Sequence, residues 1–254
     1  MTPSKHRYLL YKELPNFYSF SEYFEDLILY IALFDAKDKY YIDIGAFDPI
    51  SVSVTKILYL KGWHGINIEP QSQKIELFKK DRPNDINLEM TVGEKNGIVK
   101  LYINDQCTTI HKKYSEGINN AIKVKMDTMS NICKQYVPEG TEIDFCKIDV
   151  EGGERGVLLG YDFVNYRPKI FCIESTIPKS TVPNHNLWEY ILIDNNYTYI
   201  FTYGVNRYYF DNKYPGLATR FKKSYQYIKQ YKKYFENGRI HPFKISIKAI
   251  NNSL

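Results

Sequence analysis

The chain has 254 residues, a net charge of +5 and a hydrophobic content of 44 %. That length suits one α/β domain with additions, and that apolar content is enough for a core, which argues against an intrinsically disordered chain. The four cysteines form no C-x-x-C pair, so we expect neither a disulfide framework nor a thiolate metal site. The N-terminus has no secretory signal pattern, and the longest apolar stretch, residues 27–34, is too short to span a bilayer. These features predict a reduced, cytoplasmic protein.

The charge is unevenly distributed along the chain. From Lys213 onward there are ten Lys or Arg residues and one acidic residue, Glu236, whereas the rest has 24 basic and 28 acidic residues. We therefore divide the sequence into an N-terminal helical segment (1–38), a central domain (39–212) and a basic C-terminal tail (213–254). The acidic body suits a cationic cofactor, and the basic tail suggests an anionic surface as its partner.

Helices and strands alternate in the first half of the chain. A capping-box pair, Ser19 and Glu22, precedes apolar residues at helical spacing, which predicts an N-terminal helix that reaches about Phe34. Short β-branched runs predict strands, and the stretches between them predict helices that end at Gly62 or begin at Pro70. The predicted strands are 40–44, 65–68 and 87–92, and the predicted helices are about 51–61 and 70–80.

The second half continues this alternation. An inserted hairpin or edge pair is predicted first, followed by a helix capped by Asp127. Two closing strands are separated by a short turn, so we expect them to be antiparallel to each other. The predicted elements are the pair 97–104 and 121–126, helices at 129–136 and 187–194, and strands at 145–149, 169–174, 197–201 and 207–210. The alternation favours a right-handed, mostly parallel sheet.

The tail contains a predicted basic amphipathic helix. Its apolar stripe runs from Leu217 to Phe235, and its lysines lie mostly off that stripe. Such a helix can lie on the inner face of a membrane, where it would suit a lipid-linked glycan. A helix docked on the protein body with a solvated basic face has the same pattern, and we favour that interpretation.

Acidic residues stand where four predicted strands end. Each carboxylate follows a short apolar run, as in the sequences YYIDIGAFDP (40–49) and IDFCKIDVEGGE (143–154). In an open parallel sheet the carboxyl ends of the strands line one crevice, where ligands bind. We therefore expect one pocket for a ligand with hydroxyls and positive charge, or for a metal. The acidic residues are Asp43, Glu69, Asp149, Glu151 and Glu174.

The loop after the first strand indicates the type of cofactor. A dinucleotide fold would have G-x-G-x-x-G here, but this loop has only Gly45, followed by Ala46. The missing pyrophosphate cradle favours a nucleoside cofactor without phosphates, such as S-adenosylmethionine. Glu69 comes 24 residues after Gly45, where an acidic residue can accept both ribose hydroxyls. We predict that Asp43, Gly45, Ala46, Glu69 and Pro70 bind the cofactor; a loop cap and a helix N-terminal neighbour are the structural alternatives for Asp43 and Glu69.

Longer stretches of the chain resemble the FkbM family of S-adenosylmethionine-dependent methyltransferases. The sequence IDVEG at 148–152, after GINIEP at 65–70, carries the resemblance most specifically. The similarity covers about residues 20–212, and the basic tail lies outside it. The matching stretches are FEDLIL (24–29), YIDIGAFDPISVSVTK (41–56), KGWHGINIEP (61–70), KKDRPNDINL (79–88), IDFCKIDVEGGERGVLLG (143–160), YRPKIFCIEST (166–176), VPNHNLWEYIL (182–192) and GVNRYYF (204–210).

The resemblance implies a fold and a reaction. The fold would be the class I methyltransferase sandwich, a Rossmann-like α/β arrangement with a seven-stranded, mostly parallel sheet whose last strand is antiparallel. To it this chain adds an N-terminal helix and a basic helical tail. Members of the family are similar to O-methyltransferases that act on hydroxyls of sugars, polyketides and glycoconjugates. In that fold, residues that end the fourth strand contact the methionine part of the cofactor and the acceptor, which implies such contacts for Asp149 and Glu151.

Methyl transfer to a hydroxyl needs a general base or a Lewis-acid metal, because an alcohol is a poor nucleophile. His185 is the predicted base, since its loop should overhang the pocket and NHNLWE matches the family; a surface or helix-capping histidine is the alternative. Asp149 and Glu174 are the other predicted catalytic residues. Asp149, Glu174 and His185 together form a candidate site for a divalent cation such as Mg²⁺. A carboxylate network without an ion is the alternative.

Four further residues are predicted to bind the acceptor. Glu25 and Asp26 would close the pocket from the N-terminal helix, unless they form a solvated helix end. Asn206 and Arg207 would hydrogen-bond a sugar or its acidic neighbour, although Arg207 also suits a surface strand. We expect Arg82 and Asp85 to form a structural ion pair.

The function favoured by the sequence is O-methylation of a sugar or glycan in a cell-surface polysaccharide or glycoconjugate. The alternatives are an O-methyltransferase of a small secondary metabolite and a non-catalytic binding module. The missing glycines disfavour an oxidoreductase with a nucleotide cofactor. The basic tail and the 24 tyrosines motivate a nucleic-acid methyltransferase, but we do not expect a nucleic-acid partner. The oligomeric state is not indicated.

Overall fold

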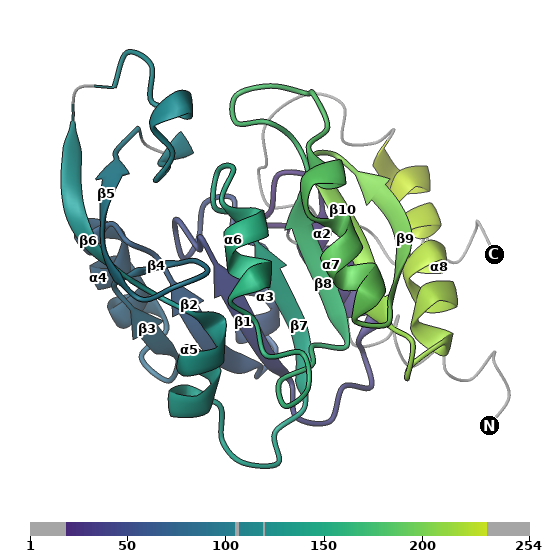
Figure 1. Cartoon of the computed structure of the whole chain (residues 1–254). Helices are drawn as coiled ribbons and strands as arrows, with labels where there is room; N and C mark the ends of the chain where they lie inside the picture. The colour runs from purple at the N-terminus through teal and green to yellow at the C-terminus, as the bar shows by residue number, and fades with distance from the viewer. Residues whose placement is uncertain (1–18, 105–106, 119, 233–254) are drawn as a thin grey trace, which may run out of the picture.

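Seven strands form the main sheet. The computed structural model describes residues 19–232 except 105, 106 and 119. The strands are β1 (Tyr40–Ile44), β2 (His64–Ile68), β3 (Ile86–Leu88), β7 (Ile143–Ile148), β8 (Ile170–Glu174), β9 (Tyr197–Tyr203) and β10 (Asn206–Asp211). Their order is β3-β2-β1-β7-β8-β10-β9, and β10 is antiparallel to both neighbours (Figure 1). This confirms the predicted Rossmann-like α/β sheet, mostly parallel with an antiparallel last strand.

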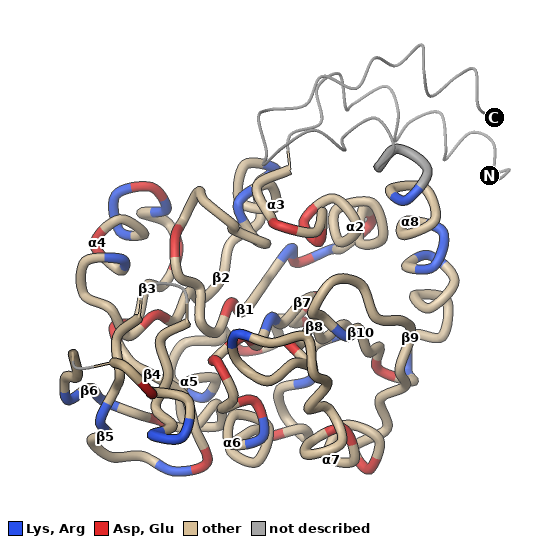
Figure 2. Tube along the Cα trace, turned by 90° about the horizontal axis from the view of Figure 1, so that it is seen from above, with Lys and Arg blue, Asp and Glu red and all other residues tan. Residues whose placement is uncertain are grey.

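Helices cover both faces of this sheet. One face carries α2 (Glu25–Ala32), α3 (Lys56–Leu60) and α8 (Gly216–Lys232). The other carries α5 (Met129–Tyr136), α6 (Glu154–Leu159) and α7 (Glu189–Asp194), and Figure 2 shows the two layers edge-on. Successive residues of a strand point to opposite faces, so Tyr41 packs in the first core and Ile42 in the second. The remaining long helix, α4 (Ser72–Asp81), contacts β3 at the sheet edge.

A smaller sheet stands beside the β3 edge. It consists of β4 (Thr91–Val92), β5 (Gly97–Tyr102) and β6 (Ala121–Asp127), in the order β4-β6-β5. The antiparallel pairing of β5 with β6 confirms the predicted inserted hairpin. The single strand predicted at 87–92 is wrong, because the chain turns after Leu88. Its first part pairs with β2 in the main sheet, and its second part pairs with β6.

The start of α2 differs from the prediction. Ser19 and Glu22 do not form a capping box. The hydroxyls of Ser19 and Ser21 instead donate to the Asp26 carboxylate at 2.7 and 2.8 Å, and the helix begins at Glu25. Asp26 is buried and also accepts from the backbone N–H of Phe20 at 2.6 Å. It therefore fixes the entry of the chain into α2 and is not available to an acceptor in this arrangement.

Two other helix boundaries were also predicted wrongly. Thr128, not Asp127, caps α5, because its Oγ1 accepts from the backbone N–H of Asn131 at 3.2 Å. The helix predicted from residue 51 begins only at Lys56. The residues before it form an irregular loop whose hydroxyls face a buried arginine. Helix α6 was not predicted at all.

The tail helix α8 is docked on the body. Leu217, Phe221 and Ile228 are buried in the first core, and Tyr225 stacks on Phe201 with ring centroids 4.8 Å apart. The helix also packs along α2. The described part of its apolar stripe, up to Ile228, is thus packed on protein, as the favoured interpretation expects. Phe235, the predicted end of the stripe, lies outside the described residues. Among the described helices, none has the length and apolarity that a membrane crossing requires.

A buried arginine connects the end of α4 to the loop after β1. Arg82 is fully buried, and the predicted ion pair with Asp85 is not direct. Asp85 instead accepts from the Tyr41 hydroxyl and from Asn67 Nδ2, two side chains that also contact Arg82. The nearest carboxylate to the guanidinium is that of Asp81, 3.7 Å from Nε. The oxygens that accept from Arg82 at 2.7–3.3 Å belong to Tyr41, Pro49, Ser53, Thr55 and Asn67.

Replacing Arg82 should therefore destabilise the whole domain. In Arg82→Met the hydroxyl, amide and carbonyl oxygens around the guanidinium lose their donors inside a dry core. We expect a loss of about 3–5 kcal/mol in the free energy of unfolding, measured by urea denaturation. The exposed Arg155 provides the matched control, and Arg155→Met should stay within about 0.5 kcal/mol of the parent protein. Equal stabilities of the two variants would contradict a structural role for Arg82.

Candidate active site

A cavity of about 460 Å³ lies at the carboxyl ends of β1, β2, β7 and β8. Its volume falls in the range of about 300–1,000 Å³ that is typical of small-molecule sites, and its place in the sheet is where such folds bind ligands. The two sides of its wall differ in polarity. Apolar residues next to β2 and the small sheet are Phe47, Pro70, Met90, Val92, Leu101 and Ile110. Acidic residues at or before the start of α2, after β7 and at the end of β8 are Glu22, Glu25, Asp149, Glu151 and Glu174.

Most of the predicted site residues meet in this cavity. Four of them do not reach its lining, namely Asp26, Asp43, His185 and Arg207. Those that do are Glu25, Gly45, Ala46, Glu69, Pro70, Asp149, Glu151, Glu174 and Asn206.

Asn206 and Arg207 are neighbours in sequence but point to opposite faces of β10. Asn206 pairs in register with Glu174 of β8 and lines the cavity. Arg207 packs over the Tyr199 ring at 4.0 Å and forms an ion pair of 2.6 Å with Glu189 of α7. It therefore ties β10 to the second helical layer and does not line the cavity.

His185 lies in a short 3₁₀ helix, η3 (His185–Leu187), immediately before α7. Its side chain is half-buried outside the cavity lining, and its Nδ1 is buried without a hydrogen-bond partner. The candidate metal-ligating group of the described residues contains Glu151 where the sequence suggested His185. His185 therefore does not line the cavity in this structure.

The ends of β1 and β7 are locked against each other. Gly45 has φ +75°, and a Cβ atom there would lie 1.7 Å from the carbonyl oxygen of Asp149. The loop after β1 can pass this close only because residue 45 is glycine. Asp43, two residues earlier, is buried; its Oδ2 accepts from the Thr55 hydroxyl at 2.6 Å, while its Oδ1 has no partner.

Glu69 is held at the tip of β2 by backbone donors. Its two carboxylate oxygens accept from the N–H groups of Phe47 and Gln71, at 3.0 and 2.9 Å. Burial raises the pKa of Glu69 to about 7, although these hydrogen bonds oppose the shift. The Gln71 side chain also hydrogen-bonds this carboxylate, which leaves it one further lone pair that can accept from a ligand hydroxyl.

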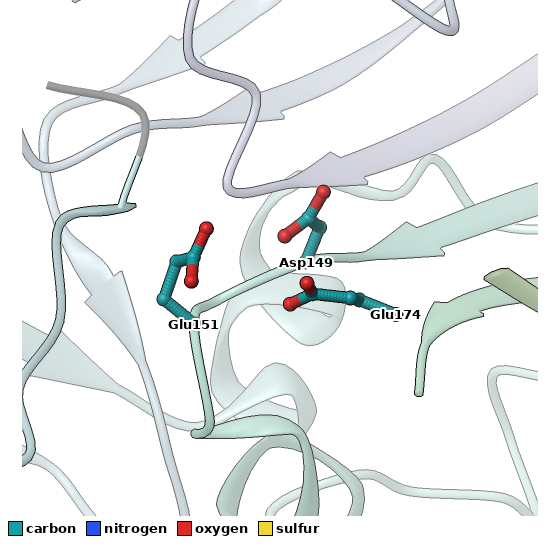
Figure 3. A group of neighbouring side chains, drawn as sticks. All are labelled: Asp149, Glu151 and Glu174. Carbon is teal, nitrogen blue, oxygen red and sulfur yellow. The ribbon is translucent and has the colours of Figure 1, made fainter. Parts of the chain in front are cut away.

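Three acidic side chains form what we call the carboxylate cluster: Asp149, Glu151 and Glu174. One oxygen from each lies within 4.8 Å of the other two, and Figure 3 shows the three carboxylates facing a common space. Burial raises the pKa of Glu174 and of Glu151, and the negative charge of Asp149 raises both further. The cluster therefore resists holding three negative charges without a counter-charge.

Lys147 is the basic residue closest to this cluster. It is buried on β7, and its Nζ lies 3.0 Å from Asp149 Oδ2 and 3.5 Å from the Gly45 carbonyl oxygen. Burial lowers the pKa of Lys147, but the carboxylates of Asp149 and Asp43 outweigh burial and raise it overall. The amine thus stays protonated and cannot act as a base at neutral pH.

A hydrogen bond joins the N-terminal helix to the closing hairpin. Asn206 Nδ2 donates to Glu25 Oε1 at 2.8 Å, and the backbone N–H of Tyr23 donates to Glu25 Oε2 at 2.8 Å. Both Glu25 and Asn206 are buried and line the cavity. Burial raises the pKa of Glu25 to about 7.

Several lining residues were missed at the sequence level. Lys147 had a signal, because a lysine inside the apolar run of β7 is costly to bury unless it meets a carboxylate. Phe47, Gln71 and Lys179 gave no comparable signal, since loop side chains have no periodicity that predicts their direction.

The chain matches the model of a known domain family. The model of the Methyltransferase FkbM domain matches residues 43–201, which is more than half of the chain. The matched region contains Asp43, Glu69 and the whole carboxylate cluster, whereas Glu25 and Asn206 lie outside it. No curated protein matches the chain at a significant level of similarity.

The burial of Glu25 predicts that thermal stability falls as the pH rises. A glutamate has a pKa of about 4.3 in the unfolded chain, and the folded state raises the pKa of Glu25 to about 7. The folded protein therefore holds this proton more tightly than the unfolded chain does. The resulting contribution to the free energy of unfolding is complete below the pKa of the unfolded state and is lost as the pH rises through the pKa of the folded state. We expect the melting temperature from scanning calorimetry to drop by several degrees between about pH 5 and about pH 8.

Two glutamine variants test the origin of this slope. Glu25→Gln keeps an amide oxygen for Asn206 but cannot titrate, so its melting temperature should depend less on pH. Glu76 is exposed on α4, and Glu76→Gln should keep the parental slope. The same slope in all three proteins would rule out Glu25 as its source.

Proposed function

The chain belongs to the FkbM family of methyltransferases, and from that membership we propose that it methylates a hydroxyl of a sugar or glycan with S-adenosylmethionine as the methyl donor. The polarity of the cavity is the observation that carries the proposal. An apolar wall with one carboxylate suits a nucleoside, and the acidic wall suits hydroxyl groups and positive charge. Both walls belong to the same cavity of about 460 Å³.

The residues present fit S-adenosylmethionine. When bound, it supplies an electrophilic methyl group on a sulfonium. Glu69 would accept from a ribose hydroxyl, since its carboxylate is fixed by two backbone N–H groups and retains a free lone pair. Phe47 and Pro70 supply apolar surface for the base, and Asp149 and Glu151 supply negative charge for the cationic end.

The hydrogen-bonding character of the acidic wall supports a methyl acceptor that presents hydroxyl groups. Carboxylate and amide oxygens accept hydrogen bonds, and sugars present many hydroxyl donors. Six carboxylates and two lysines, Lys147 and Lys179, line the cavity. The excess of negative charge favours neutral or amino sugars over sugars that carry carboxylates.

The chain's own groups align the acceptor and receive its proton. Glu25 and Asn206 form one side of the acceptor position, with their mutual hydrogen bond of 2.8 Å fixing both side chains. Asp149 and Glu174 are the carboxylates to which the hydroxyl proton can move. Lys147 orients Asp149 through its contact of 3.0 Å. Holding oxygen, carbon and sulfur in line is then mainly a proximity effect.

We also propose that exposed lysines of α8 favour an anionic surface, such as that of a membrane carrying a lipid-linked glycan. Lys222, Lys223 and Lys229 are exposed, while the apolar stripe of the same helix is packed on the body. The attraction would then be electrostatic and sensitive to salt. Truncation at Lys213 would uncover the core, so the better test replaces all three lysines with glutamate. Binding to anionic liposomes is then measured by sedimentation. Unchanged binding of this triple variant would contradict the proposal.

Cofactor binding is the first test of this function. Isothermal titration with S-adenosylmethionine and S-adenosylhomocysteine should show one site. Glu69→Gln removes the charge that accepts from the ribose, a hydrogen bond worth about 1.5–3 kcal/mol, so the affinity should fall roughly 10- to 150-fold. Glu76→Gln, on the exposed side of α4, should bind as the parent protein does. Absence of binding by the parent protein would remove the basis for the proposed function.

The acceptor class is tested by methyl transfer to a panel of neutral, amino and carboxylated saccharides, with products identified by mass spectrometry. We expect methyl ethers on neutral or amino sugars and little product on carboxylated ones, because the wall is acidic. Glu25→Ala should raise KM more than it lowers kcat if Glu25 positions the acceptor. Products found exclusively on amine nitrogens, or on nucleic acid, would contradict an O-methyltransferase of glycans.

A further inference from the structure

The carboxylate cluster holds more negative charge than its protein contacts neutralise. Lys147 pairs with Asp149 at 3.0 Å. Within residues 19–232, as far as the structure describes them, neither Glu151 nor Glu174 forms an ion pair, although both face Asp149 (Figure 3). The protein therefore supplies one ammonium to three neighbouring carboxylates.

Glu174 points independently to a bound ligand. Its side chain is 8 % exposed, and its Oε2 is buried with no hydrogen-bond donor in reach. Glu151 Oε2 is likewise buried and unpartnered. A carboxylate oxygen removed from water without a donor is costly. Glu151 Oε2 and Glu174 Oε2 are almost inaccessible to water. They belong to carboxylates that face the common space of the cluster.

The spacing of the oxygens suits one cation. Oxygens on opposite sides of Mg²⁺ are about 4.2 Å apart, and those around the larger Ca²⁺ are about 4.6–5.2 Å apart. The three oxygens of the cluster all lie within 4.8 Å of one another, so a single ion can reach all of them with small side-chain adjustments. A ligand set made only of carboxylate oxygen selects hard divalent cations.

We propose that Asp149, Glu151 and Glu174 bind one hard divalent cation, such as Mg²⁺ or Mn²⁺, and that this ion positions the acceptor hydroxyl. The role assigned to the ion rests on the proposed function, whereas the site itself rests on the cluster geometry. The ligand set differs from the one the sequence suggests, because Glu151 replaces His185.

The ion would change how the hydroxyl is activated. A hydroxyl oxygen bound to a divalent cation loses its proton more readily. The O–H bond breaks with the proton passing to water in the open part of the cavity, the new O–CH₃ bond forms, and the S–CH₃ bond breaks. Asp149 and Glu174 then act on the hydroxyl through the ion. The competing arrangement is a proton shared between Glu174 and Asp149 with no ion.

Direct binding of Mn²⁺ tests the site without any assay of activity. The full chain is stripped with a chelator, Mn²⁺ is titrated, and free Mn²⁺ is followed by electron paramagnetic resonance. We expect one bound Mn²⁺ that Mg²⁺ displaces. Glu174→Gln should weaken this binding by more than about tenfold. Glu139 is an exposed glutamate remote from the cavity lining, and Glu139→Gln should leave binding unchanged.

Thermal shift supplies a second measurement in case a variant folds poorly. Mg²⁺ should raise the melting temperature of the parent protein and of Glu139→Gln but not that of Glu174→Gln. Metal-free Glu174→Gln should melt at or above the parent temperature, since an unpaired buried carboxylate has been removed. If Glu174→Gln is destabilised and Mg²⁺ still raises its melting temperature, the proposed cation site is wrong.

The outcomes separate this proposal from the proposed function. Binding of S-adenosylmethionine without any binding of Mn²⁺ overturns the cation site, leaves the methyltransferase proposal standing and supports the shared proton. Binding of Mn²⁺ that depends on Glu174, without binding of S-adenosylmethionine, supports the site and overturns the function. Binding of Mn²⁺ that Glu174→Gln does not weaken places the ion elsewhere and overturns the proposal.

Discussion

Carboxylates gathered at the ends of parallel strands place more negative charge at one edge of this sheet than a dry interior tolerates. The register makes this unavoidable, because β1 lies between β2 and β7, and Asp43 stands opposite Lys147 in the β1–β7 pair. Lys147 is thus built into the sheet as the counter-charge, and it reaches Asp149 at 3.0 Å. The two lysines of the lining, Lys147 and Lys179, cannot balance its six carboxylates, so the cavity favours positive charge and hydrogen-bond donors.

Buried hydrogen bonds hold the loop on the apolar side of the cavity. The loop after β1 wraps Arg82, and the Thr55 hydroxyl both accepts from Arg82 at 2.7 Å and donates to Asp43 at 2.6 Å. A single hydroxyl therefore links the buried arginine to the acidic edge of the sheet. Gly45 lets the same loop approach the chain after β7 closely. Local disruption of either contact would move Glu69 and Asp149 relative to each other, which is the geometry that a ligand spanning both walls requires.

The strand ends were predictable, whereas the directions of side chains in loops were not. Apolar runs and parallel topology suffice to bring Asp149 and Glu174 together, because strand ends meet at one edge. His185 was expected over the cavity, but it begins a short 3₁₀ helix and lies outside the cavity lining, and no sequence pattern specifies that turn. Alternation along β10 separates Asn206 from Arg207, and a pairing register is needed to tell which of them faces the cavity. The role of Arg82 depends on partners far apart in sequence, which a reading of local patterns cannot assemble.

The part of the fold beyond the matched domain contributes to the same cavity. Glu174 stands opposite Asn206 in register, Asn206 donates to Glu25 at 2.8 Å, and Glu25 begins α2. Helix α2 packs in turn along α8, whose Leu217 and Phe221 are buried with it. The described part of the basic tail therefore has a structural role: α8 packs against the helix that supplies Glu25 to the cavity wall. Its lysines point outward because its apolar face is already used, so any affinity for an anionic surface would come from charge alone and leave the cavity wall intact.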